Sequence, residues 1–468
     1  SDDASDALGT RSVRDGIHGQ AVTGGLTIRG TTMRRFSDMA IHGATFAGAG
    51  TTTWNGLEII DSLIQDSNRY HIGPEGPAGL GDDNAEGMVR ILGLSGTVLV
   101  QNSTLERGGQ LLDFLTASSG TLAMTVQSSN FNRTLKEFLC APPGTVNIGK
   151  AGISVRVTGS ADLDLFVGDP AEADASLGNT FLDNATASIV VLHDTASATG
   201  EIDTIISRNT FRVLDHLTGP AGCPAGSFLF NTAQGGVFLG PGAGDFEGIV
   251  SNNLFDQVQN ANGGIGQLSV TFDDGGDGEL IVRGNNFQLP WDASVRLLAD
   301  GNNSAAVLFG GPGAGQANTY TDGVVGGASD DLGGPSTSPF NPWSVNVRNG
   351  GRLDLKIDSE ILPQHDDVFS AFPNSFDASI NPTGGTLNLH ITDSVSPDGY
   401  RFDIAAGTVN LFNEENVGGC PISAAQILDD NGNTGGGNSD ATDPPTVVGG
   451  GGVTCSTTAP AAPSVMIP

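Results

Sequence analysis

The sequence has little charge, and very little of that charge is positive. Charged residues make up 15% of the 468 positions, and 20 Lys and Arg face 52 Asp and Glu, which gives a formal net charge of −32. A surface of this sign repels nucleic acid and anionic lipid, so we expect neither as a partner. It attracts cations, and salt relieves its self-repulsion.

Cysteine is scarce as well. The four cysteines include no C-x-x-C pair, which disfavours a zinc knuckle and a thioredoxin-type redox motif. Their even number allows two disulfides, and a Cys420–Cys455 bridge would fasten the C-terminal tail to the body of the protein. Three pairings stay open among Cys140, Cys223, Cys420 and Cys455.

Long apolar runs are also missing. No segment is apolar over the length that a membrane-spanning helix needs, so we expect no membrane insertion. The chain begins at Ser1 without a methionine, and the simplest account is an exported chain whose leader has been removed. A chain cut at this point for another reason would look the same. The expected location is extracellular or at the cell surface.

Glycine, in contrast, is abundant, with 69 residues. Glycine is costly inside helices, so this number favours short strands joined by tight turns. One pattern recurs: an apolar, a polar and an apolar residue, then a turn, then an apolar residue five positions after the second apolar one. Copies are Leu26-Thr-Ile28 with Met33, and Leu57-Glu-Ile59 with Ile64. Toward the C-terminal end of the sequence, the spacing between the second apolar residue and the apolar residue after the turn shortens to four positions, as from Ile357 to Ile361.

This pattern predicts a coiled stack of strands. Alternate residues of a strand face the same side, so the two apolar residues of each copy enter one core. The turn residues are types that tolerate unusual backbone dihedrals, such as Asp61, Asn102, Ser128 and Asn252. Units repeated in this way bury a continuous core when they stack.

Three N-x-F triplets carry a resemblance. Asn179-Thr-Phe181, Asn209-Thr-Phe211 and Asn253-Leu-Phe255 resemble the repeat core of the right-handed parallel β-helix, or pectin-lyase-like, superfamily, in its surface and structural branch. The resemblance implies an all-β, single-stranded parallel β-helix (a solenoid) with three short sheets, long loops between coils and stacked asparagines at one turn. It also implies interior stacks formed by Phe131, Phe211, Phe255 and Phe287.

The repeat sets the expected domain limits. Residues 1–20 form an N-terminal segment or cap, residues 21–427 form the β-helix, and residues 428–468 form a tail rich in Gly, Asp and Pro. The longest of the insertions between coils spans residues 310–342. Loops of this length are often functional or disordered.

Enzymes of the superfamily resemble this chain less well at their catalytic motifs. The polygalacturonase type carries Gly-His-Gly and Arg-x-Lys, but Ile17-His18-Gly19 and Ile41-His42-Gly43 lack the first glycine, and Arg-x-Lys is absent. No two histidines show H-x-H or H-E-x-x-H spacing, so the sequence also disfavours a transition-metal site. We therefore assign no catalytic residue, and the sequence favours a protein that is not an enzyme.

Calcium is the one cofactor with a signal. The Gly-rich turn 273–279 holds four carboxylates, and the segment 429–440 roughly repeats the oxygen spacing of a calcium loop, although Thr434 stands where such a loop has glycine. The candidate ligands are Asp273, Asp274, Asp277, Glu279, Asp429, Asn431, Asn433 and Asp440.

Together these features predict a non-catalytic extracellular structural or adhesive protein, such as a self-assembling filament, sheath or surface-layer subunit. One alternative is a polysaccharide lyase or glycoside hydrolase, and another is a phage tail fibre or spike. Self-association is the expected partner interaction, because the ends of a β-helix expose rows of backbone groups that pair with other chains unless capped. Segments 446–448 and 464–467 could add to a neighbour or fold back as a cap, and carbohydrate binding stays open.

Calcium should stabilise the chain modestly through one of the two acidic segments. A site filled at 100 times its dissociation constant adds about 2.7 kcal/mol to the free energy of unfolding. Thermal melts in calcium and in chelator, both at high sodium, measure this gain. Equal melting temperatures would contradict the expectation.

Overall fold

A computed structural model of the chain consists almost wholly of β-strands. Among the described residues a single 3₁₀ turn, Ala175–Leu177, is the only helix, and none of them forms a helix long and apolar enough to cross a membrane. The described residues are 15–36, 39–43, 53–67, 87–134, 140–141, 151–184, 187–214, 228–229, 236–258, 266–273, 275–288, 294–321, 343–360, 362, 376–380, 383–392, 394, 400–404, 407–413, 427–428 and 452–455.

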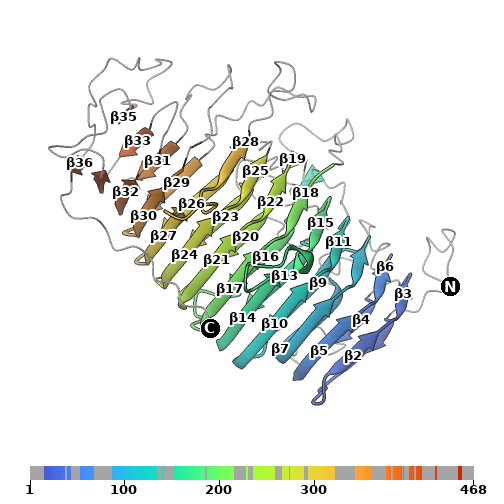
Figure 1. Ribbon diagram of the computed structural model, residues 1–468. Coiled ribbons are helices and arrows are strands. Elements are labelled where there is room, and N and C mark those ends of the chain that lie inside the picture. Colours follow the sequence, from blue (N-terminus) through green and yellow to red (C-terminus); the bar gives the residue numbers. More distant parts are fainter. Residues whose placement is uncertain are drawn as a thin grey trace. The chain divides into compact units, whose positions relative to one another are not determined.

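The chain divides into two compact units, Ser1–Phe238 and Leu239–Pro468. Within each unit, parallel strands pair in three ladders (Figure 1). Most coils contribute one strand to each ladder in turn, but among the described residues ladder 3 ends at β28 while ladders 1 and 2 go on. The predicted fold is confirmed: the protein is all-β and forms a parallel β-helix.

In unit 1, ladder 1 contains β1 (Ile17–His18), β4 (Ile41–Gly43), the first part of β7 (Gly87–Gln101), β9 (Gln110–Thr116), β13 (Ile153–Val157) and β16 (Ile189–His193). Ladder 2 contains β2 (Leu26–Arg29), β5 (Trp54–Ile60), the second part of β7, β10 (Ser119–Gln127), β14 (Ser160–Gly168) and β17 (Ile202–Ser207). Ladder 3 is built from strands of three residues: β3 (Thr32–Arg34), β6 (Leu63–Gln65), β8 (Thr104–Glu106), β11 (Asn130–Asn132), β15 (Thr180–Leu182) and β18 (Thr210–Arg212). A separate antiparallel pair joins β12 (Cys140–Ala141) to β19 (Phe228–Leu229).

Unit 2 repeats this plan, and β20 (Val237–Gly240) crosses the boundary between the units. Its ladder 1 continues with β23 (Leu268–Phe272), β26 (Val295–Asp300), β29 (Trp343–Arg348), β31 (Phe376–Ile380), β33 (Tyr400–Ile404) and β35 (Ile427–Leu428). Ladder 2 contains β21 (Phe246–Ser251), β24 (Asp277–Arg283), β27 (Ser304–Gly310), β30 (Arg352–Asp358), β32 (Thr386–Thr392), β34 (Thr408–Asn413) and β36 (Gly452–Cys455). Ladder 3 contains β22 (Leu254–Asp256), β25 (Asn286–Gln288) and β28 (Thr319–Thr321).

The corner between ladders 2 and 3 depends on one left-handed residue in each coil. Asp61, Asn102, Ser128 and Asn252 have φ angles of 50°, 49°, 50° and 54°. This conformation costs Asx side chains less than most others, because they bond to nearby backbone groups. The turn residues expected from the repeat therefore occupy the corners of the coil.

Directly after this corner, a polar side chain points inward in each coil, and we call the resulting row the polar ladder. In unit 1 the amide N–H of Ser129 donates to Asn179 Oδ1 at 2.9 Å, and both N–H and Nδ2 of Asn179 donate to Asn209 Oδ1 at 3.0 and 2.9 Å. Ser62 and Ser103 hold the equivalent places in earlier coils. These bonds satisfy backbone groups that the corner would otherwise bury without partners.

The polar ladder of unit 2 uses asparagine in three successive coils and then passes to Glu360 and Ser394, whose Oγ accepts from the Glu360 N–H at 2.9 Å. N–H and Nδ2 of Asn253 donate to Asn285 Oδ1, both at 3.0 Å, and those of Asn285 donate to Asn318 Oδ1, both at 2.9 Å. The stacked asparagines that the resemblance implied are thus confirmed.

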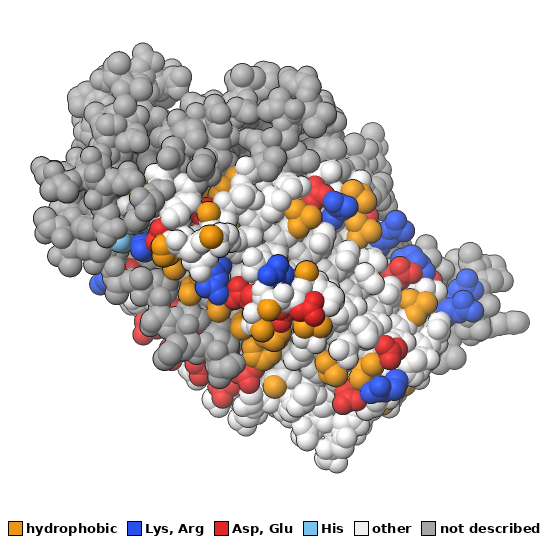
Figure 2. All heavy atoms as spheres, viewed as in Figure 1, with side chains coloured by type: hydrophobic (Ala, Val, Ile, Leu, Met, Phe, Trp, Pro, Cys, Tyr) orange, Lys and Arg blue, Asp and Glu red, His pale blue; other side chains and the backbone are white. Residues whose placement is uncertain are grey.

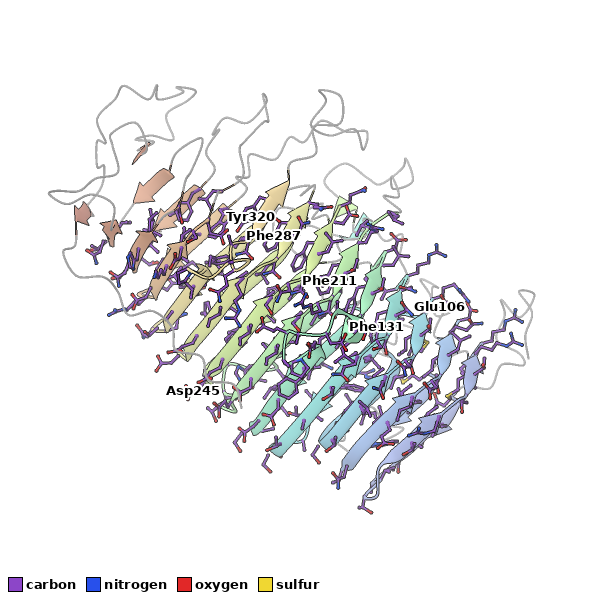
Figure 3. All side chains as sticks on the ribbon, in the orientation of Figure 1. Glu106, Phe131, Phe211, Asp245, Phe287 and Tyr320 are labelled. Carbon is purple, nitrogen blue, oxygen red and sulfur yellow. The ribbon has the colours of Figure 1, made fainter. Side chains whose placement is uncertain are left out.

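Aromatic side chains stack just inside ladder 3, as expected (Figure 3). In unit 1 the ring centroids of Phe131 and Phe181 lie 5.0 Å apart, and those of Phe181 and Phe211 lie 4.9 Å apart. In unit 2 Phe255 stacks on Phe287 at 4.8 Å. All five rings are fully buried, so the predicted interior stacks are confirmed.

Two strands lie in segments that the sequence set apart from the coils. β1 belongs to the predicted N-terminal segment 1–20 and pairs with β4, while β36 belongs to the predicted tail 428–468 and pairs in parallel with β34. The rest of both segments lies largely outside the described residues. Leu362, five positions after Ile357, is buried, while Ile361, on which the predicted interval of four falls, lies outside the described residues.

The polar ladder of unit 2 passes from asparagine to a carboxylic acid at Glu360. Its Oε1 accepts from N–H and Nδ2 of Asn318 at 2.8 and 2.9 Å, and the side chain is fully buried. Burial raises the pKa of Glu360 to about 7 against the hydrogen bonds from Asn318 and Tyr320, and the nearby charge of Asp358 adds a smaller rise. The folded chain therefore holds a proton here that an unfolded glutamate releases.

Glu360 should make unfolding easier as pH rises from about 4.5 to about 7. In this window the folded state binds a proton that the unfolded state has lost, so stability falls, by an upper limit of about 3 kcal/mol. Glu360→Gln keeps an acceptor and cannot ionise, so we expect it to be more stable than the native chain at pH 8 and nearly equal to it at pH 4. Urea unfolding at both pH values measures the difference.

Glu247→Gln is the matched control, since Glu247 is only half-buried on β21. This substitution should change stability little at either pH. A Glu360→Gln effect of the same size at pH 4 and pH 8 would show that titration of Glu360 is not its cause.

Candidate metal centre

Parallel register brings two identical sequence triplets together at the N-terminal end of ladder 1. β1 pairs with β4 so that Ile17 lies beside Ile41 and His18 beside His42. Ile41 is fully buried in the core. Because neighbouring residues of a strand face opposite sides, the two histidines face away from the core and lie side by side.

Asp15 completes a cluster with these histidines. His18 Nδ1 and His42 Nδ1 lie 3.2 Å apart, and Asp15 Oδ2 lies 3.4 Å from the first and 3.3 Å from the second. The rings meet edge to face, with centroids 4.7 Å apart. Among the described residues this is the one group of three or more His, Cys, Asp or Glu whose ligand atoms lie within 4.8 Å of one another.

The three distances fit one face of a tetrahedron around a metal ion. Zinc binds imidazole nitrogen and carboxylate oxygen at about 2.0–2.1 Å, which places tetrahedral ligand atoms about 3.3–3.4 Å apart. The observed separations of 3.2, 3.3 and 3.4 Å lie close to that range. Two nitrogens and one oxygen are therefore spaced as three ligands of a four-coordinate ion.

The carboxylate of Asp15 is held in its ionised form. Burial would raise its pKa, but the hydrogen bond with His42, the charge of His42, the amide of Met39 and the charge of His18 outweigh burial and lower the pKa. The Met39 N–H contacts Asp15 Oδ1 at 3.4 Å, so Oδ2 is the oxygen that faces the histidines. An ionised carboxylate is the form that binds a metal ion.

On the opposite edge of the His18 ring, the side-chain amide nitrogen of Gln20 lies 3.4 Å from Nε2. If Nδ1 binds a metal ion, Nε2 carries the proton and needs an acceptor. If the side-chain amide of Gln20 is rotated by a half-turn, its oxygen takes the place of its nitrogen and accepts the proton of Nε2. Hydrogen bonds of this kind fix the tautomer and orientation of metal-binding histidines.

The calcium candidates do not gather into such a group within the described residues. Asp277 is exposed on β24, Glu279 is half-buried two residues further on, and Asp273 follows β23. Asp274 and the whole segment 429–440, with Asp429, Asn431, Asn433 and Asp440, lie outside the described residues. The calcium sites remain predictions.

The disulfide candidates are equally untested. The backbones of Cys140 and Cys455 belong to β12 and β36, but their side chains lie outside the described residues, as do Cys223 and Cys420 entirely.

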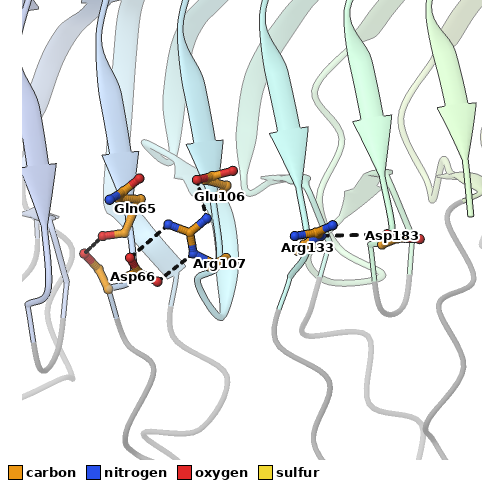
Figure 4. Close-up of polar contacts among 7 residues, drawn as sticks. Gln65, Asp66, Glu106, Arg107, Arg133 and Asp183 are labelled. Carbon is orange, nitrogen blue, oxygen red and sulfur yellow. Dashed lines mark hydrogen bonds and ion pairs between the residues drawn. The ribbon is translucent and has the colours of Figure 1, made fainter. Parts of the chain in front are cut away.

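Charged residues elsewhere in unit 1 serve to join coils. Asp66, Arg107, Arg133 and Asp183 all take the left-handed conformation after ladder 3. Arg107 binds Asp66 of the preceding coil with two hydrogen bonds, at 2.7 and 3.0 Å, and Arg133 lies 3.9 Å from Asp183 of the following coil (Figure 4). On the face in Figure 2, Arg and Lys likewise lie beside Asp and Glu at several points. These contacts are structural ion pairs.

The sequence analysis did not identify the cluster of Asp15, His18 and His42. It tested for two histidines close in sequence, whereas coil stacking joins residues 24 positions apart. The signal was the repeated Ile-His-Gly triplet, since two copies of a motif on neighbouring coils stand in register.

Comparison with protein-family models, with curated proteins and with solved structures finds no match for this chain. Membership of the pectin-lyase-like superfamily therefore rests on the N-x-F residues and remains a prediction. A fold by itself carries many functions, so function has to be argued from the cluster.

Proposed function

We propose that this chain is a structural β-helix protein that binds one divalent transition-metal ion, with zinc as the best fit, through Asp15 Oδ2, His18 Nδ1 and His42 Nδ1. The observation that carries the proposal is the set of three ligand-atom separations, 3.2, 3.3 and 3.4 Å. They match the edges of a tetrahedral site without rearrangement of the backbone.

The ligand types narrow the choice of metal. Imidazole nitrogen suits zinc, copper, nickel and iron, whereas calcium and magnesium take oxygen ligands almost alone. Tetrahedral spacing favours zinc over metals that prefer square-planar or octahedral sites. Three protein ligands also leave one of four positions for water or another ligand.

The place of the site in the fold supports a structural role. Asp15 precedes β1, His18 lies in β1, and His42 lies in β4 of the next coil. β1 and β4 pair over only two residues, the shortest of the three strand pairings between these coils, so a bound ion would add a link where the backbone supplies least. We extend the proposal to the wider role inferred from sequence: an extracellular structural or adhesive protein that associates with its own copies.

Zinc titration of the full chain, without an added histidine tag and after chelator treatment, tests the proposal. We expect one zinc ion per chain at pH 7.5. His42→Ala removes a ligand and should weaken binding by at least about 100-fold, since loss of even a partner of a ligand costs 10–100-fold. Isothermal titration calorimetry with a competing chelator measures both values.

Two control variants isolate the cluster. His193→Ala removes a buried histidine that bonds to the Gly200 carbonyl at 2.9 Å, and Asp61→Asn changes an exposed corner residue. Both should keep the native zinc affinity, whereas Asp15→Asn should lose most of it. Absence of zinc binding by the native chain, or native affinity in His42→Ala, would refute the proposal.

A further inference from the structure

Three aliphatic side chains form a row on the outer face of ladder 2 in unit 2. Ile249 on β21 is the register partner of Ile281 on β24, and Ile281 is the partner of Leu308 on β27. Each stands between two buried residues of its own strand, so its side chain points away from the core, and each is half-buried. We call these three residues the outer aliphatic row. A continuous apolar surface of this kind marks a place where another segment or molecule binds.

The register position of this row leads to the last strand of the chain. On the next three strands the position is held by Lys356, His390 and Phe412. β36 ends at Cys455, the partner of Leu411, so the position after Cys455 lines up with Phe412. The chain therefore leaves β36 in line with the outer aliphatic row.

The sequence after β36 has the composition of a segment that binds an apolar surface. Residues 456–468, which lie outside the described residues, contain no charged side chain in a chain of net charge −32. Pro460 and Pro463 favour an extended backbone over a helix. Residues 465–467, Val-Met-Ile, supply large apolar side chains. Such a segment can approach an acidic surface without charge repulsion.

The segment is also long enough to reach the row. Four steps between adjacent strands separate β36 from β27, and six steps separate it from β21. At about 4.8 Å a step, these distances are about 19 and 29 Å. An extended, proline-rich chain advances about 3.1 Å per residue, so the ten positions from Cys455 to Val465 cover about 31 Å.

We propose that the C-terminal segment of the same chain folds back over ladder 2 and places Val465, Met466 and Ile467 on the outer aliphatic row. The occupant is this segment because it starts in line with the row, matches it in apolar character and spans the distance. Its covalent tether also gives it a higher concentration at the row than a separate copy has in dilute solution.

Photo-cross-linking of the full chain tests the proposal. A benzophenone amino acid is placed at position 466, and irradiation joins it to C–H groups in contact. We expect the cross-linked peptides to contain Ile249, Ile281 or Leu308, in material that migrates as a monomer. Peptide mass spectrometry locates the cross-link, and denaturing gel electrophoresis separates monomers from cross-linked dimers.

A charge in the row should displace the segment. Ile281→Asp, combined with the probe at position 466, should lower the yield of the cross-link at least about tenfold, because the segment would have to bury an unpaired carboxylate. Thr271→Asp is the matched control, since Thr271 is an outward-facing, half-buried residue of β23 on ladder 1, and should leave the yield unchanged. Ile281→Ser serves in place of Ile281→Asp if the latter does not fold, as judged by circular dichroism.

Three results would overturn the proposal. Cross-links of the otherwise native chain that map only to other surfaces would show that the segment does not bind the row. Cross-links to the row that occur only in dimers would assign the row to the segment of a second copy. Equal yields with and without the Ile281 substitution would show that the row does not hold the segment.

Discussion

Parallel register between successive coils is the constraint on which the other features depend. Once a residue pairs with its counterpart on the next coil, every position of the repeat becomes a row along the ladder, and like side chains meet. The Phe131–Phe181–Phe211 stack and the Asn253–Asn285–Asn318 chain of hydrogen bonds are such rows inside the coil. The two Ile-His pairs of β1 and β4 are another, with isoleucine inside and histidine outside.

A row satisfies buried backbone N–H groups while each coil supplies a side-chain acceptor, as serine does at Ser103 and Ser129 and asparagine at Asn179 and Asn209. Asparagine is suited to this because its amide offers an acceptor to one coil and donors to the other. Glu360 accepts from Asn318 as asparagine would, but it has no side-chain N–H to donate to the next coil, which its backbone N–H alone joins through Ser394, and burial favours the protonated form of its carboxyl. A substitution in the row thus converts a structural position into a titratable one.

The fold could be predicted because its signals are local. The apolar-x-apolar pattern, the N-x-F triplets and turn residues such as Asn252 each lie within a few positions, and strand alternation and corner geometry translate them directly into structure. The repeated Ile-His-Gly triplet marks the pairing of His18 with His42, but no repeat marks a pair such as Arg107 and Asp66, 41 positions apart, because insertions of different length separate consecutive coils and hide which residues share a row.

Zinc K-edge X-ray absorption of the full chain with one equivalent of zinc tests the metal centre most directly. The account predicts a four-coordinate shell of nitrogen and oxygen at about 2.0–2.1 Å, with the outer scattering of two imidazole rings. A shell of five or six oxygens without imidazole scattering would contradict it.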